Sequence, residues 1–270
     1  MNAKVGIGIT TYEDIRAAAF GHAFYETLVA GAPKLAPDRI EVLYNRFEVE
    51  NAQDFASHWC TETRHVLHSK HGVTPSYTPP SDYGASWRTR GSLTGHGQVF
   101  FGGRDPNAPA TLTLEHRFTP RVPWKEIFRR LVHIFKPAHA NIHVFTEREL
   151  ELAGDGCFAF RGPICGEAAF TAWNSPLGTI RGPDPWEIAE RRRYRFLPEL
   201  AWGNYLGNQF SGSYNREKLL GISNTSKELN EGVLFHVTDD LRDVVRRSDF
   251  FERERKELHK AFPSEFFRSN

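Results

Sequence analysis

Histidines are the residues of this chain best suited to metal or acid–base chemistry, and three of the twelve recur at regular spacing. His65, His68 and His71 stand three residues apart, close to Cys60. In a helix, each three-residue step turns the side chain by about 60°, so the three would spread over an arc of about 120° and would not converge on one ion. Zinc sites on a helix more often use residues i and i+4. The spacing therefore favours exposed or capping histidines near a helix C-terminus over a metal site, and no cofactor is expected.

The other histidines are scattered, and no Asp or Glu is obviously placed to orient one of them as a base. The paired carboxylates Asp239-Asp240 follow an apolar run, where such pairs can be catalytic. They are also ordinary turn and N-cap residues, which is the favoured interpretation because no partner base or phosphate loop accompanies them. We therefore expect a protein that is not an enzyme. The alternative is a hydrolase or transferase whose site is assembled from His116, His143, His236 and Asp239.

A second group of residues suits binding better than catalysis. Tyr, Trp and Arg are enriched in binding hot spots because they bury a large area and still offer hydrogen-bond donors. Five of them crowd into one proline-containing stretch: Tyr77, Tyr83, Trp87, Arg88 and Arg90. We predict a long loop from Val73 to Arg90, and long loops within compact domains are often functional. These five residues are predicted to bind a protein partner, and the alternative is that the aromatic side chains pin the loop onto the body of the protein.

Composition narrows the class of protein. The 270 residues carry a net charge of +1, and the basic run 191–195 is mixed with nearby glutamates, so nucleic-acid binding is not expected. The three cysteines Cys60, Cys157 and Cys165 lack the two-residue spacing of zinc or redox motifs, which favours reduced thiols in the cytosol. There is no signal-peptide pattern and no run of about 18 apolar residues. We expect a cytoplasmic protein with no membrane segment.

The elements that must position these residues follow from hydrophobic periodicity. We predict strands at 5–11, 40–44, 98–101, 111–118, 142–145 and 232–238, with the strand at 111–118 half polar. We predict helices at 13–30, 51–71, 123–135, 186–194 and 249–261, and a further helix within 197–207 that ends at a glycine. Residues 154–185 are expected to be irregular. The pattern indicates an α+β fold, a mainly antiparallel sheet with helices packed on it. It forms one domain over 1–270 or two closely fused halves with a boundary near 150–185.

One stretch carries a family resemblance. Residues 197–207 read Leu-Pro-Glu-Leu-Ala-Trp-Gly-Asn-Tyr-Leu-Gly, and a Gly-Val-Leu-Phe run follows at 232–235. This resembles the type VI immunity family, which carries a similar Leu-Pro…Trp-x-x-Tyr/Phe-Leu-Gly stretch. The middle of the chain is similar to the immunity protein 52 family, through the strand pair around 97–118, a helix, and the Phe-Lys-Pro turn at 135–137. The N-terminal third matches neither family.

The resemblance implies a cytoplasmic immunity protein of a polymorphic-toxin or type VI secretion system. Such a protein binds a cognate antibacterial toxin and blocks it, here by steric occlusion. The implied partner is therefore a toxin or effector protein. A non-catalytic interaction module of another kind remains a third alternative.

Overall fold

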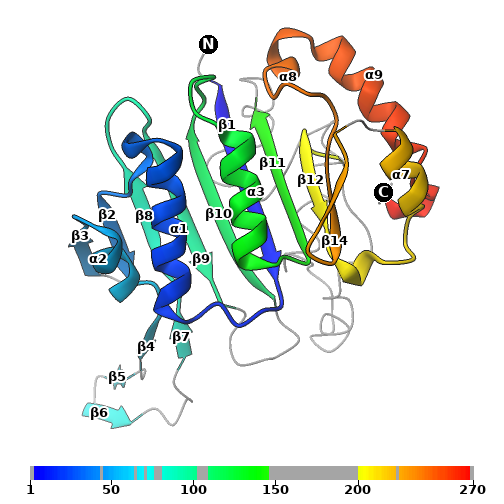
Figure 1. Ribbon diagram of the computed structural model, residues 1–270. Helices are drawn as coiled ribbons and strands as arrows, with labels where there is room; N and C mark the ends of the chain where they lie inside the picture. The colour runs from blue at the N-terminus through cyan, green and yellow to red at the C-terminus, as the bar shows by residue number, and fades with distance from the viewer. Residues whose placement is uncertain are drawn as a thin grey trace.

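The computed structural model describes residues 3–42, 45–63, 66–69, 72–75, 81–101, 109–145, 200–222 and 225–267. Its centre is a ten-stranded sheet in the order β13-β14-β12-β11-β1-β10-β9-β8-β2-β3, and all neighbouring strands are antiparallel. The strands are β1 (Lys4–Thr11), β2 (Arg39–Val42), β3 (Asn45–Glu48), β8 (Ser86–Thr89), β9 (Gly95–Phe100), β10 (Ala110–Arg117), β11 (His139–Phe145), β12 (Gly203–Leu206), β13 (Lys227–Leu229) and β14 (Gly232–His236). Two short ladders, β4 (Thr61–Thr63) with β7 (Ser81–Tyr83) and β5 (Val66–Ser69) with β6 (Gly72–Pro75), extend away from the sheet (Figure 1).

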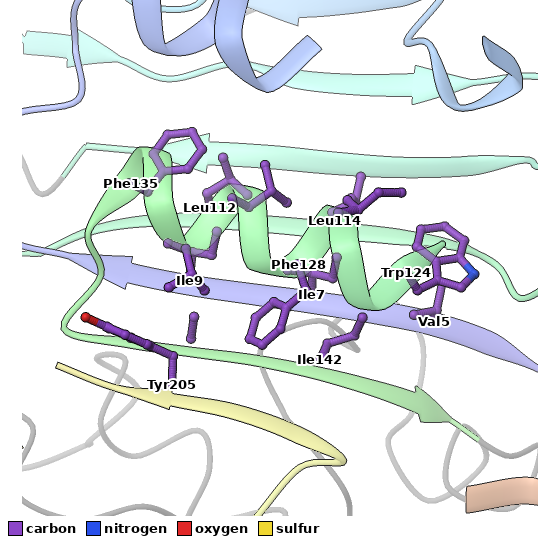
Figure 2. Packing of buried hydrophobic residues seen from close by; sticks show 14 of the residues in the cluster. Val5, Ile7, Ile9, Leu112, Leu114, Trp124, Phe128, Phe135, Ile142 and Tyr205 are labelled. Atoms are coloured by element: carbon purple, nitrogen blue, oxygen red, sulfur yellow. The ribbon is translucent and has the colours of Figure 1, made fainter. Parts of the chain in front are cut away.

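Helices α1 (Ala18–Gly31), α2 (Ala52–Ser57) and α3 (Trp124–Phe135) lie on one face of the sheet, which we call the front face (Figure 1). The core between these helices and the sheet is aliphatic in the middle of the sheet and aromatic toward α2. Figure 2 shows α3 lying over β1, with Phe128 of the helix near Ile7 of the strand. Toward α2, Trp87 packs its ring centroid 4.9 Å from that of Phe24.

The opposite, back face is covered at one end by α7 (Arg216–Ile222), α8 (Asp243–Arg246) and α9 (Ser248–His259). Side chains alternate between the faces of a strand, so His143 of β11 points away from the front-face residue Ile142. The ring of Phe251 in α9 lies 5.7 Å from that of His143, and Phe262 lies 6.2 Å from Phe235 of β14. The helices at the two ends of the sheet therefore pack on opposite faces.

The predicted α+β class is confirmed, and most of the long elements are confirmed with it. The strands near 5–11, 40–44, 98–101, 111–118, 142–145 and 232–238 and the helices near 13–30, 123–135 and 249–261 all exist. β10 has the predicted alternation of polar and apolar residues, but its polar side is not exposed, because Thr113 and Glu115 are buried like Leu114 between them. Strands from both sides of 150–185 join the same sheet. The predictions for 154–185 and 186–194 lie outside the described residues.

Three predicted elements are wrong. The helix at 51–71 ends at Ser57, and His68 lies in the β5–β6 ladder, while His65 and His71 lie outside the described residues. The predicted loop from Val73 to Arg90 contains strands β6, β7 and β8. The predicted helix within 197–207 is replaced by strand β12, which β11 and β14 flank. In each case pairing with another strand overrides a local helical or irregular pattern.

Candidate functional site

Most back-face side chains of β9, β8 and β3 are solvent-exposed and those of β2 are half-buried, in contrast to the other end of the sheet. In β9 the residues Gly95, Gly97 and Val99 are buried, whereas the alternating residues His96, Gln98 and Phe100 are exposed. The register places Arg88 beside His96 and Arg39 beside Arg88 on this same side. We call the surface formed by the following residues the open face: Arg39, Glu41, Arg46, Glu48, Arg88, His96, Gln98 and Phe100.

Two arginines and a histidine form a row across the open face. Arg39 of β2, Arg88 of β8 and His96 of β9 are direct cross-strand neighbours. Such neighbours have Cβ atoms about 5 Å apart, and like charges in these positions destabilise a sheet. Arg39 is compensated by Glu48, with Nε and Oε1 3.3 Å apart. Within the described part of the chain, no carboxylate lies within salt-bridge distance of Arg88.

Arg46, the remaining arginine of the open face, also has a carboxylate partner, so Arg88 differs from the other two in having none among the described residues. The Arg46 Nε lies 3.1 Å from Glu41 Oε1 on the neighbouring strand. At the end of β8, Arg90 lies 3.3 Å from Asp38 and 3.4 Å from Glu48. These pairs are largely exposed, so each adds little to stability, but they do compensate the charges locally.

Phe100 is the second unusual feature of the open face. Its side chain is 62% exposed, more than any other large hydrophobic residue of the described chain. A single exposed hydrophobic residue is ordinary on a protein surface. Here the aromatic ring shares a regular sheet face with an unpaired arginine, and both residue types are common in binding hot spots. An exposed ring and an unpaired guanidinium on one sheet face are the kinds of group that protein partners contact.

The five residues predicted to bind a partner fall into different environments. Arg88 and Arg90 are exposed, and Arg88 belongs to the open face. Trp87 is only 1% exposed and packs against Phe24 and Phe55 on the front face, as the alternative interpretation of a pinned aromatic residue expects. Tyr83 lies in β7, and Tyr77 lies outside the described residues.

Sequence reasoning missed His96, Gln98 and Phe100. Their signal was the alternation Gly-His-Gly-Gln-Val-Phe at 95–100, in which one side of the strand is small or apolar and the other carries larger side chains. The prediction began this strand at Gln98 and so left out the residues that make the alternation visible.

The histidines of the alternative enzyme site do not meet. His116 and His236 are both on the front face, but β1, β11 and β12 lie between their strands. Four inter-strand steps of about 4.8 Å separate them by about 19 Å. His143 lies on the back face, where its Nδ1 accepts a hydrogen bond from the backbone N–H of Trp202 at 3.1 Å.

Their surroundings are those of core histidines. The ring of His116 bonds through Nδ1 to the Leu93 carbonyl oxygen at 2.9 Å, and burial lowers its pKa to about 4. His236 packs 4.6 Å from Trp202, and burial lowers its pKa to about 3. Both are therefore neutral at pH 7.

Asp240, which follows Asp239 of the alternative enzyme site, caps a turn, as the favoured interpretation of the paired carboxylates expects. A side-chain oxygen of Asp240 accepts a hydrogen bond from the backbone N–H of Arg242 at 2.9 Å. The Arg242 side chain, bonded to the same carboxylate, lowers the pKa of Asp240. Across the residues described, no group of three or more His, Cys, Asp or Glu side chains is arranged to hold a metal ion.

A buried carboxylate lies next to His96, toward the centre of the sheet. Glu115 of β10 is the cross-strand neighbour of His96 and is 3% exposed. Its Oε1 lies 2.5 Å from the Lys4 ammonium, so the charge is compensated at the edge of the buried region. A buried charge requires such a partner.

Comparison with known proteins shows a likeness of fold. No family model matches the chain, and no curated protein matches it. Among solved structures, the chain is similar to "Pseudomonas aeruginosa T6SS protein PA0821", with a TM-score of 0.52 and 9% sequence identity. The match covers 99% of this chain and 76% of the other. At this identity the likeness concerns the fold alone. Of the helices in the described segments, none is long and apolar enough to cross a membrane.

Proposed function

We propose that this protein acts in the cytoplasm as an immunity protein of a type VI secretion system, binding a cognate antibacterial toxin. Two lines of reasoning support the proposal. The chain has a fold similar to that of the Pseudomonas aeruginosa T6SS protein PA0821, over nearly its whole length. The resemblance of 197–207 and 232–235 to immunity families points to the same biology.

The observation that carries the proposal is the exposed ring of Phe100 on the same sheet face as Arg88, which is unpaired in the described chain. A preformed surface binds at a lower entropic cost than a segment that must become ordered on binding. Aromatic and arginine side chains at the centre of an interface supply most of its affinity. Neutralisation then requires only that the bound chain covers the toxin's active site.

We propose that the protein has no catalytic role in neutralisation. The argument is that His116, His143 and His236 lie apart in the fold, so they cannot share a substrate. A variant that replaces His116 with Asn and still folds is expected to neutralise the toxin as the wild type does. Loss of neutralisation by a folded His116→Asn variant would contradict the non-catalytic proposal.

Growth rescue tests the function directly. The proposal predicts a neighbouring gene that encodes a large protein with a toxic C-terminal domain. Expression of that domain alone in the cytoplasm is expected to stop growth, and co-expression with this chain is expected to restore it. An unrelated protein of similar size serves as the control. Continued growth arrest, with the chain present in folded form, would refute the proposal.

A further inference from the structure

The open face has an uncompensated positive charge at a defined place. Arg88 stands between Arg39 and His96 in one cross-strand row. Arg39 has Glu48 as its partner, whereas in the described chain Arg88 has none. The guanidinium of Arg88 is therefore available to an incoming carboxylate, and charge-assisted hydrogen bonds of this kind are stronger than neutral ones.

The apolar contact lies at a fixed distance from this charge. His96, Gln98 and Phe100 point to the same side of β9, and Arg88 is level with His96. Residues rise about 3.4 Å each along an antiparallel strand, so Phe100 lies about 14 Å along β9 from the level of Arg88. A partner must therefore present a carboxylate and an apolar pocket at about this separation, which fits within a protein–protein interface of ordinary size.

We propose that the open face receives a surface of the toxin that presents one carboxylate, bound to Arg88, and an apolar pocket, filled by Phe100. The inference rests on the proposed function and names the surface and the chemistry of its partner. The guanidinium of Arg88 can form two parallel hydrogen bonds with one carboxylate, which sets orientation as well as affinity. The Phe100 ring supplies the apolar area that excludes water from the centre of the contact.

A protein partner fits this surface better than a nucleic acid. Nucleic-acid binding needs several unpaired cations along a continuous face. On the open face Arg39 and Arg46 already have carboxylate partners, so in the described chain Arg88 is the one arginine of this face that can pair with a new anion, which suits a single carboxylate better than a run of phosphates. The whole chain has a net charge of only +1.

The test measures the affinity of purified variants for the toxin domain encoded by the neighbouring gene, carrying an inactivating substitution. Arg88→Glu and Phe100→Ser are the test variants. Their matched controls are Arg121→Glu, an exposed arginine between β10 and α3, and Ile222→Ser, a 39% exposed side chain in α7. Circular dichroism and melting temperature establish that each variant is folded.

We expect Arg88→Glu and Phe100→Ser each to weaken binding by about tenfold or more, while both controls bind as the wild type does. The affinity of the wild type is expected to fall as salt rises, and that of Arg88→Glu to depend less on salt. A Lys substitution at one acidic surface position of the toxin should restore binding to Arg88→Glu and weaken binding to the wild type.

The outcomes separate the inference from the proposed function. If the wild type neutralises the toxin and both test variants bind as their controls do, the open-face inference is overturned and the proposed function stands. If the wild type neither binds nor neutralises the toxin, both are overturned. Binding of a short DNA duplex by the wild type, lost in Arg88→Glu, would overturn the choice of a protein surface as the partner.

Discussion

The buried histidines make the stability of this protein sensitive to mild acid. His116, His139 and His236 are almost fully buried, and burial lowers their pKa values to about 4, about 3 and about 3 from the ordinary 6.5. In the unfolded chain they bind protons as the pH falls below 6.5, whereas in the folded protein they stay neutral. The unfolded state therefore binds more protons, and the free energy of unfolding falls as the pH falls through this window.

The magnitude follows from the two pKa values of each group. A histidine with an unfolded pKa of 6.5 and a folded pKa of about 4 or 3 lowers the free energy of unfolding of the protein by about 2 kcal/mol between pH 7.5 and pH 5. Three such groups give about 6 kcal/mol, which is a large part of the ordinary 5–15 kcal/mol stability of a domain. The carboxylate of Glu126 does not add to the loss of stability between pH 7.5 and pH 5. Hydrogen bonds from Arg129 and Arg130 lower its pKa from 4.5 to about 2, so its contribution is lost only below about pH 4.5.

Urea unfolding at pH 7.5 and at pH 5.0, followed by circular dichroism, measures this loss. The variant His116→Asn keeps a side-chain N–H that can donate to the Leu93 carbonyl oxygen. It is expected to lose about 2 kcal/mol less than the wild type between the two pH values, whatever its stability at pH 7.5. An equal loss in both proteins would refute the assignment of His116 as a neutral buried group.

The two faces of the sheet give further predictions. Trp87→Ala is expected to lower the free energy of unfolding by about 3–5 kcal/mol, because it leaves a cavity in the aromatic core. Arg88→Ala is expected to change it by less than about 0.5 kcal/mol, because Arg88 lies on the surface. Similar effects of the two substitutions in urea unfolding would contradict the placement of Trp87 in the core and of Arg88 on the open face. Gly97→Ala is expected to destabilise by about 1–3 kcal/mol, because its Cβ would lie 2.5 Å from the Trp87 ring and 2.4 Å from the Thr113 carbonyl oxygen. Gly221→Ala, where nothing lies within 4 Å, is its control and is expected to leave the melting temperature unchanged or raised.

The sequence predicted best where a long element has a strong period of its own. In α3, Ile127, Phe128 and Leu131 mark one helix face, and that face is buried on the sheet. In β10, the eight residues from Ala110 to Arg117 form a strand as expected, yet both of its faces are buried. Local alternation indicated the strand correctly but could not tell whether its polar face, with Thr113 and Glu115, would be covered by other parts of the chain.

The misjudged elements are short and depend on distant partners. β12 has only four residues, all buried, and a short apolar run does not distinguish a strand from a buried helix. Its strand form comes from pairing with β11 and β14, which precede and follow it at long range. The prediction of the candidate site was incomplete for the same reason. Arg88 was recognised by residue type, but its basic neighbours Arg39 and His96 reach it only through the register of three strands.

Register connects the core of this protein to its open face. Side chains of a strand alternate between faces, so a shift of one residue in β8 would bring Arg88 into the aromatic core and Trp87 into solvent. Burial of Trp87 against Phe24 and Phe55 makes that shift costly. Gly97, the cross-strand neighbour of Trp87, has no side chain and leaves room for the indole ring. The same packing that stabilises the front face therefore holds Arg88 on the open face, so a variant that loosens the Trp87 site should also weaken partner binding.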